Sequence, residues 1–92
     1  MTIQKSLANG DQYGFGTKNG VSTTLFAENQ SNYTVTGSIT WSGEITNFSI
    51  PPKKQITLFR SARGNGEPVF AKNTVPKTEP LAIIKFTFTQ GG

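Results

Sequence analysis

The segment YTVTGSITWS, residues 33–42, decides the predicted fold. Its odd-numbered positions carry mostly apolar side chains: Tyr33, Val35, Gly37, Ile39 and Trp41. Its even-numbered positions all carry a hydroxyl group: Thr34, Thr36, Ser38, Thr40 and Ser42. Successive side chains of a strand point to opposite faces of a sheet. This period of two therefore predicts a long strand with one face on a core and the other toward water, as in antiparallel sheets.

Further strands are predicted on both sides of this segment. Residues 81–89, LAIIKFTFT, alternate in the same way, with Ala82, Ile84, Phe86 and Phe88 on one face. Shorter strands are expected at residues 21–28, 45–50, 55–60 and 67–72, and near 3–7 and 13–17. Turn residues recur about every ten positions, which favours a single antiparallel β-sandwich of the jelly-roll or immunoglobulin-like type with six to eight short strands.

Three local features make this prediction more specific. The apolar residues Ile45, Phe48 and Ile50 break the alternation once, which predicts a bulge or a late start of that strand. Asn65-Gly66 suits a turn with positive φ, so a hairpin between residues 55–60 and 67–72 is expected. The second of these segments is short and has the composition of an edge strand.

The chain has 92 residues, and we predict one domain over residues 1–92. It contains no Cys and no His, so neither disulfides nor an ordinary zinc site is expected to stabilise it. Stability is expected to come from apolar packing, with self-association as an additional contribution. No apolar leader follows Lys5, so we expect a soluble protein without a signal peptide, either cytoplasmic or secreted by another route.

The absence of His and Cys also excludes Ser-His, Cys-His and His-metal chemistry. A carboxylate pair for glycoside cleavage remains formally possible. The acidic residues Asp11, Glu28, Glu44, Glu67 and Glu79 are scattered and lie beside turn residues, however. The prediction is a protein that is not an enzyme, with no catalytic residue, cofactor or metal.

The formal charge of +4 favours acidic partners only mildly. Four basic residues fall in the stretch SIPPKKQITLFRSARGNGEP, residues 49–68: Lys53, Lys54, Arg60 and Arg63. The lysines and the arginines lie at opposite ends of one predicted strand, about 20 Å apart at the usual rise per residue. They are therefore expected to form two small positive ends and no phosphate cradle.

Four residues are the candidate ligand-binding set. Tyr13 and Phe15 lie among glycines in DQYGFGTKNG and are expected in an exposed loop. Arg63 and Asn65 are expected at the tip of the predicted hairpin, where they would contact an acidic or polyhydroxyl partner. Trp41 and Tyr33 fall on the apolar face of their strand, and core packing is the favoured interpretation for both.

Part of the chain resembles a known family. The segments ENQSNYTVT (28–36), SGEITNFSIPPKKQITLF (42–59) and GEPVFA (66–71) are similar in type and spacing to the amino-terminal half of actinoporin-like β-sandwich proteins, which include cytolysins and fungal fruit-body lectins. The resemblance covers about half of the chain, and an extra Glu67 interrupts its last element. It implies a sandwich that recognises glycans or lipid surfaces. Neither a pore nor any binding residue is carried over from it.

The leading functional hypothesis is a non-enzymatic recognition module: a small lectin-like, haemagglutinin-type protein, or one that binds a membrane surface. Its partner would be a glycan or a lipid head group, and homo-oligomerisation would raise the avidity of weak sites. The alternative is a self-assembling coat, capsid-decoration or fibre protein that uses the hydroxyl face or an edge strand. A weaker alternative is single-stranded nucleic-acid binding by an OB-like barrel.

Overall fold

The computed structural model describes residues 1–91, which form eight strands and no helix. The strands are β1 (Thr2–Leu7), β2 (Gln12–Phe15), β3 (Ser22–Asn29), β4 (Val35–Trp41), β5 (Glu44–Ile50), β6 (Gln55–Arg63), β7 (Val69–Asn73) and β8 (Ile84–Gly91). The predicted all-β class is confirmed, and the strand count is at the upper end of the predicted range.

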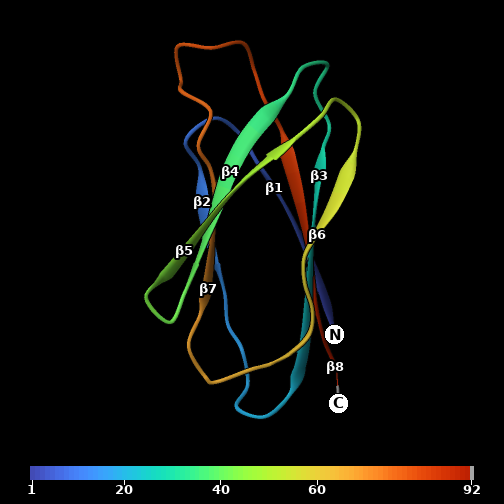
Figure 1. Ribbon diagram of the computed structural model, residues 1–92, viewed down its shortest axis with the longest axis vertical. Helices are drawn as coiled ribbons and strands as arrows, with labels where there is room; N and C mark the ends of the chain where they lie inside the picture. Colours follow the sequence, from blue (N-terminus) through green and yellow to red (C-terminus); the bar gives the residue numbers. More distant parts are fainter. Residues whose placement is uncertain (92) are drawn as a thin grey trace.

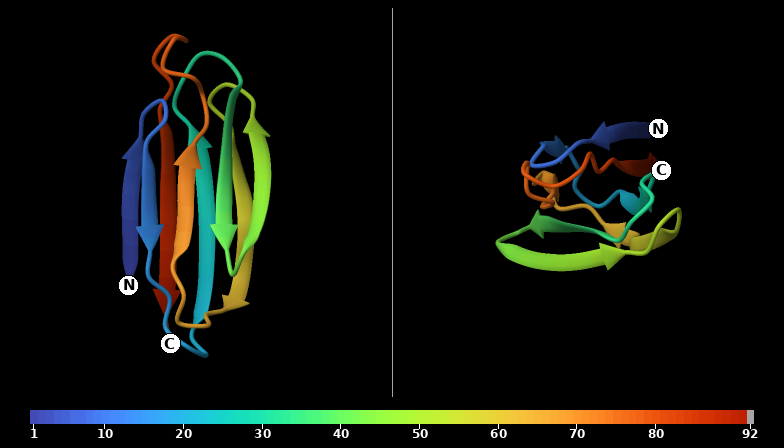
Figure 2. Two further views of the ribbon diagram at one scale, coloured as in Figure 1. Left: turned by 90° about the vertical axis from the view of Figure 1, so that its left-hand side faces the viewer. Right: turned by 90° about the horizontal axis from the view of Figure 1, so that it is seen from above.

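The strands form two antiparallel four-stranded sheets. Sheet A has the order β1-β8-β3-β6, and sheet B has the order β2-β7-β4-β5. Figures 1 and 2 show the sheets stacked as two layers, with most connections crossing between them. Only β4 and β5 are consecutive in the chain and also paired, through a tight turn at Ser42-Gly43 with φ of 52° and 80°. Positive φ at both turn residues matches the right-handed twist of a hairpin.

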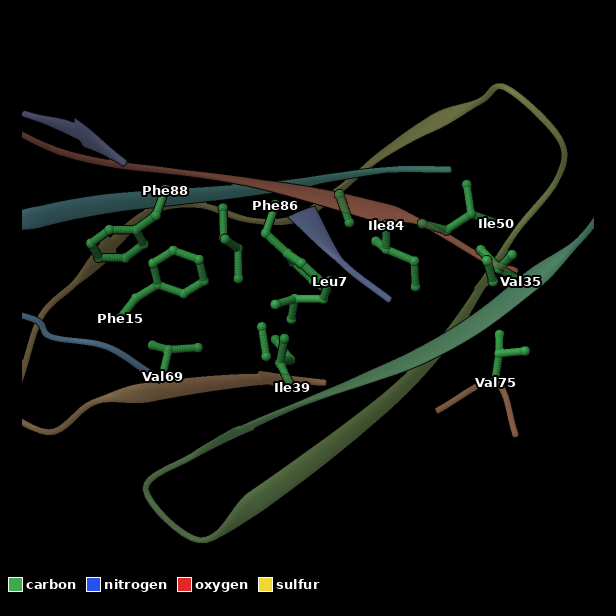
Figure 3. Packing of buried hydrophobic residues seen from close by; sticks show 14 residues of the cluster. Leu7, Phe15, Val35, Ile39, Ile50, Val69, Val75, Ile84, Phe86 and Phe88 are labelled. Atoms are coloured by element: carbon green, nitrogen blue, oxygen red, sulfur yellow. The ribbon is translucent and has the colours of Figure 1, made fainter. Parts of the chain in front are cut away.

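The core fills the space between the two sheets (Figure 3). Phe86 and Phe88 of β8 point from sheet A toward Phe15, Val69 and Ile39 of sheet B, and the rings of Phe15 and Phe88 stack with centroids 5.1 Å apart. The predicted inward face of residues 81–89 is confirmed, because Ala82, Ile84, Phe86 and Phe88 are all completely buried. Full burial of an Ile or Phe side chain contributes about 1.5–3 kcal/mol to the free energy of folding.

The alternation in residues 33–42 is also realised in β4. Val35 and Ile39 are buried in the core, whereas Thr36 is exposed on the outer face of sheet B. Gly37 occupies an inward position because the ring of Phe48 on β5 fills the space that a Cβ atom would take. Of the hydroxyl-bearing positions of β4, Thr36 is exposed and Thr40 is half-buried, whereas Ser38 is buried, so the predicted hydroxyl face is only partly exposed to water.

Two buried asparagines fasten the loops at the end of the sandwich opposite the Ser42-Gly43 turn. The side-chain amide of Asn29 donates to the carbonyl oxygens of Tyr33, Ile50 and Pro51 at 2.7–3.1 Å. Asn73 donates in the same way to Leu7 and Ala82, and its Oδ1 accepts from the backbone N–H of Val75 at 3.0 Å. These side chains stand in for backbone partners that the loops lack.

Three local predictions are wrong. Residues 55–60 and 67–72 do not form a hairpin, because β6 pairs with β3 in sheet A while β7 pairs with β2 and β4 in sheet B. For the same reason β7 is a central strand and not an edge strand.

Neither the bulge nor the late start predicted for residues 45–50 is present, since β5 begins at Glu44 and pairs with β4 in continuous register. The irregularities are instead in β6, which has two more residues than the stretch of β3 that it pairs with, and Ser61 takes a φ of 54° there. The break in alternation at Ile45 has another cause: this side chain points outward and is 66% exposed.

Candidate ligand-binding cleft

A cleft opens at the edge of the sandwich formed by β5 and β6. Its volume is about 190 Å³, and its lining residues are Ile39, Trp41, Glu44, Thr46, Leu58 and Phe59. These residues come from both sheets, so the cleft is a place where the space between the sheets reaches the surface. Register explains the lining: Thr46 lies opposite Ile39 and Glu44 lies opposite Trp41, which places all four side chains on the inner face of sheet B.

Two aromatic rings make the wall of the cleft. The rings of Trp41 and Phe59 have centroids 5.1 Å apart and planes 30° apart, and both side chains are half-buried. Such offset stacking fixes each ring against the other. The predicted core role of Trp41 is therefore partly realised, because the ring packs against the core and also lines an opening.

A polar network holds Trp41 in place. Its Nε1–H donates to Oδ1 of Asn65 at 3.0 Å, and the side-chain amide of Asn65 donates to the Glu67 carboxylate at 3.0 Å. Oγ of Ser42 donates to the same carboxylate at 2.8 Å. The network joins the β4–β5 turn to the β6–β7 connection, so it orients the indole without entering the cleft.

The rim of the cleft is polar. The carboxylate of Glu44 and the hydroxyl of Thr46 belong to exposed residues of the edge strand β5. A carboxylate accepts hydrogen bonds from hydroxyl groups, and a threonine hydroxyl both donates and accepts. A flat apolar wall beside a few convergent polar groups is the usual composition of a small-molecule site.

The four residues predicted to bind ligand do not come together. Tyr13 and Phe15 lie on the strand β2 and not in a loop, with ring centroids 5.0 Å apart. The expected exposure of Phe15 is wrong, because Phe15 is completely buried in the core. Tyr13 is half-buried beneath the ammonium group of Lys5, 4.8 Å from its ring centre.

Arg63 and Asn65 lie at the far end of the sandwich from the loops that Asn29 and Asn73 fasten. Arg63 ends β6, and one of its guanidinium N–H groups donates to the carbonyl oxygen of Gly20 at 3.2 Å. Asn65 is exposed, as expected, but its side chain supports Trp41 as described above. A binding role for Tyr13, Arg63 and Asn65 stays a prediction.

Sequence reasoning missed Glu44, Thr46 and Phe59 as members of one site. The available signal was the parity of β5: Glu44, Thr46, Phe48 and Ile50 share the inner face, and the first two are polar. Nothing local reveals that Phe59 lies across from them, because β6 belongs to the other sheet.

Residues 1–91 lack two features. This part of the chain contains no cluster of three or more side chains suited to holding a metal ion. Nor does any helix within it have the length and apolar character needed to span a membrane.

Comparisons with known proteins give a similarity of fold. No family model matches this chain. No curated protein matches it either. Among solved structures, a de novo designed double-stranded beta-helix determined by solution NMR superposes with a TM-score of 0.57 over 99% of both chains, at 12% sequence identity. At this identity, the similarity shows the fold alone.

Proposed function

We propose that this protein is a non-enzymatic recognition module that binds carbohydrate in the cleft between β5 and β6. The observation that carries the proposal is the wall formed by Trp41 and Phe59 beside the carboxylate of Glu44. The C–H face of a sugar ring stacks on an aromatic wall, while its hydroxyl groups donate to a carboxylate and exchange hydrogen bonds with Thr46.

The size of the cleft sets the class of ligand. Its volume of about 190 Å³ is below the range of roughly 300–1,000 Å³ typical of sites for drug-sized molecules. It suits one sugar ring at the end of a glycan better than a long stretch of chain. The anionic Glu44 favours a neutral sugar, because an acidic sugar would be repelled. Affinity for a single ring is expected to be weak, so oligomerisation or clustering would be needed for firm attachment.

The type of β-sandwich is also part of the proposal. We infer a jelly roll, because the eight strands are divided between two four-stranded sheets in the orders β1-β8-β3-β6 and β2-β7-β4-β5. A jelly roll has eight strands in two sheets, and lectin domains use this fold. The described similarity to a designed double-stranded beta-helix supports this inference. The proposal also follows the lectin side of the resemblance to actinoporin-like proteins.

The single tryptophan of the chain makes the test direct, because fluorescence excited where the two tyrosines do not absorb reports on Trp41 alone. Neutral glycans selected on an array with clustered protein would be titrated in solution while the emission is recorded. We expect a saturable change in emission, and an affinity about tenfold weaker for Glu44→Gln. The matched control is Glu79→Gln, which removes the same charge in the β7–β8 connection and is expected to leave binding unchanged.

Three results would overturn the proposal. These are a blank array with no change in emission at millimolar sugar, equal losses in the two glutamate variants, or attachment to vesicles of neutral and anionic lipids in place of glycans. The last result would support the membrane-surface hypothesis instead.

Self-assembly is a second candidate function, favoured by one observation on the outer face of sheet B. Gly14, Phe70, Thr40 and Ile45 follow one another in register across all four strands, and Phe70 and Ile45 are 41% and 66% exposed. Exposed apolar side chains beside an edge strand suit contact with a second copy. Light scattering at rising concentration tests this function, and a constant monomer mass would reject it.

The OB-like barrel of the nucleic-acid hypothesis is not the fold of this chain, whose described strands form two separate four-stranded sheets.

A further inference from the structure

A second, smaller hollow lies at the end of sheet A where β3 begins and β6 ends. Its volume is about 80 Å³, and Gly20, Ser22, Ser61 and Arg63 line it. None of these residues lines the cleft of Trp41 and Phe59. The lining differs in character too, since it offers one cation and two hydroxyl groups where the cleft offers aromatic rings.

Arg63 is held across this hollow. It lies opposite Ser22 in the register of β3 and β6, and its Nη1 donates to the carbonyl oxygen of Gly20 at 3.2 Å. A guanidinium group has five N–H donors and stays charged in proteins. This hydrogen bond uses one N–H, so the guanidinium has further donors in the planar arrangement that carboxylate and phosphate oxygens prefer.

Ser61 reaches the hollow through an unusual backbone. Its φ of 54° lies in the left-handed region, which is strained for a residue other than glycine. The extra residues of β6 and the hydrogen bond from the Ser61 N–H to Oγ1 of Thr24, 3.1 Å long, accompany this conformation. A glycine would relieve the strain, yet the chain has a serine here, and this residue lines the hollow together with Ser22 and Arg63.

We propose that Arg63, Ser22 and Ser61 form a binding site for one tetrahedral oxyanion group, a sulfate or phosphate ester. At about 80 Å³ the hollow has less than half the volume of the cleft, so it suits a compact group better than a sugar ring. The guanidinium supplies charge and paired donors, and the hydroxyl groups supply further donors. Because the hollow is open to the surface, the ester can belong to a larger molecule.

A second basic residue lies on the same strand as Arg63. Arg60, three residues earlier on β6, rests on the ring of Phe26 with its guanidinium carbon 5.6 Å from the ring centre. Glu28 lies six residues along β3 from Ser22, about 20 Å away at the usual rise per residue. At physiological ionic strength an exposed charge at that distance is largely screened.

The test is a titration of isotope-labelled protein with inorganic sulfate, inorganic phosphate and glucose 6-phosphate, followed by amide chemical shifts. We expect saturable shifts at Ser22, Ser61 and Arg63, and a loss of affinity of about tenfold in Arg63→Gln. Lys72→Gln, which removes the same charge from an exposed position of β7 in sheet B, is the matched control and should bind as the parent does. Ser61→Gly keeps the charge, removes the hydroxyl and suits the positive φ, so reduced affinity in this variant would reflect the lost hydroxyl.

Equal losses in Arg63→Gln and Lys72→Gln, or linear shifts that never saturate, would overturn the site and leave only diffuse electrostatic attraction. Sulfated disaccharides and vesicles with phosphorylated inositol lipids then distinguish the two sources of the ester. The site stands apart from the proposed sugar cleft: Arg63→Gln should leave the Trp41 fluorescence response to neutral glycans intact. Failure of one proposal is therefore distinguishable from failure of the other.

Discussion

The two edges of the sandwich differ in the side chains that their strands turn inward. At the edge formed by β1 and β2, Leu7 and Phe15 are buried, and Tyr13 covers them with Lys5 above its ring. At the edge formed by β5 and β6, the inward positions at the start of β5 are Glu44 and Thr46. The first edge is closed by these side chains, although Lys5 also takes an inward position opposite Phe86, and the second opens into the cleft.

This difference shows how a sandwich acquires a site without losing its core. The second half of β5 still turns Phe48 and Ile50 inward, and Ile50 is completely buried. Within β5, Glu44 and Thr46 are the inward positions that depart from the apolar pattern. An edge strand tolerates such residues because its side chains border water on one side. Variants at the two edges should therefore have opposite consequences for stability and binding.

The largest effect is expected from Phe15→Ala at the closed edge. The lost ring would leave a cavity beside Phe88, with a cost of about 3–5 kcal/mol in the free energy of unfolding. Urea unfolding followed by circular dichroism measures it, with the exposed Phe70→Ala as control, for which a much smaller loss is expected. A loss below about 1 kcal/mol would show that Phe15 is not part of the core.

The next largest loss of stability is expected from Asn73→Ala, because the side chain of Asn73 holds loop segments together by hydrogen bonds. The change would leave the buried carbonyl oxygens of Leu7 and Ala82 and the N–H of Val75 without their partner. Each such group costs about 1–3 kcal/mol, so a total loss of roughly 2–4 kcal/mol is expected once part of it is relieved by water. Thermal unfolding measures it, and an unchanged midpoint would contradict the fastening role.

Thr46→Ile tests the open edge and should make it resemble the closed one. The larger apolar side chain would enter the cleft beside Ile39, changing stability by no more than about 1.5 kcal/mol while weakening sugar binding. The Trp41 titration measures the binding. Asn47→Ile adds similar bulk to the same strand on its outer face and should leave binding intact. If Thr46→Ile binds sugar as tightly as Asn47→Ile does, the cleft is not the binding site.

The smallest effect on stability is expected from Ile45→Lys. This side chain is 66% exposed, and surface substitutions of this kind change the free energy of unfolding by about 0.5 kcal/mol or less. The informative readout is the mass in solution. If copies of the chain associate through the outer face of sheet B, the variant should be monomeric at concentrations where the parent is not.

The sequence by itself determined the strands and their inner faces. Alternation in residues 33–42 and 81–89 identified Val35, Ile39, Phe86 and Phe88 as inward, because the period of two is a local property of extended backbone. The positive φ at Gly66 was likewise predictable from Asn65-Gly66, since that pair favours such turns. None of these features depends on which strand lies beside which.

Only the tertiary structure decided the partners of each strand, and with them the candidate site. A hairpin from β6 to β7 satisfied every local rule, yet the chain crosses between sheets at that point so that both strands can bury their apolar faces. Phe15 looked exposed among its glycines, but Phe88, far along the chain, covers it. Trp41 and Phe59 form one wall because residues distant in sequence meet there, and no local pattern encodes that meeting.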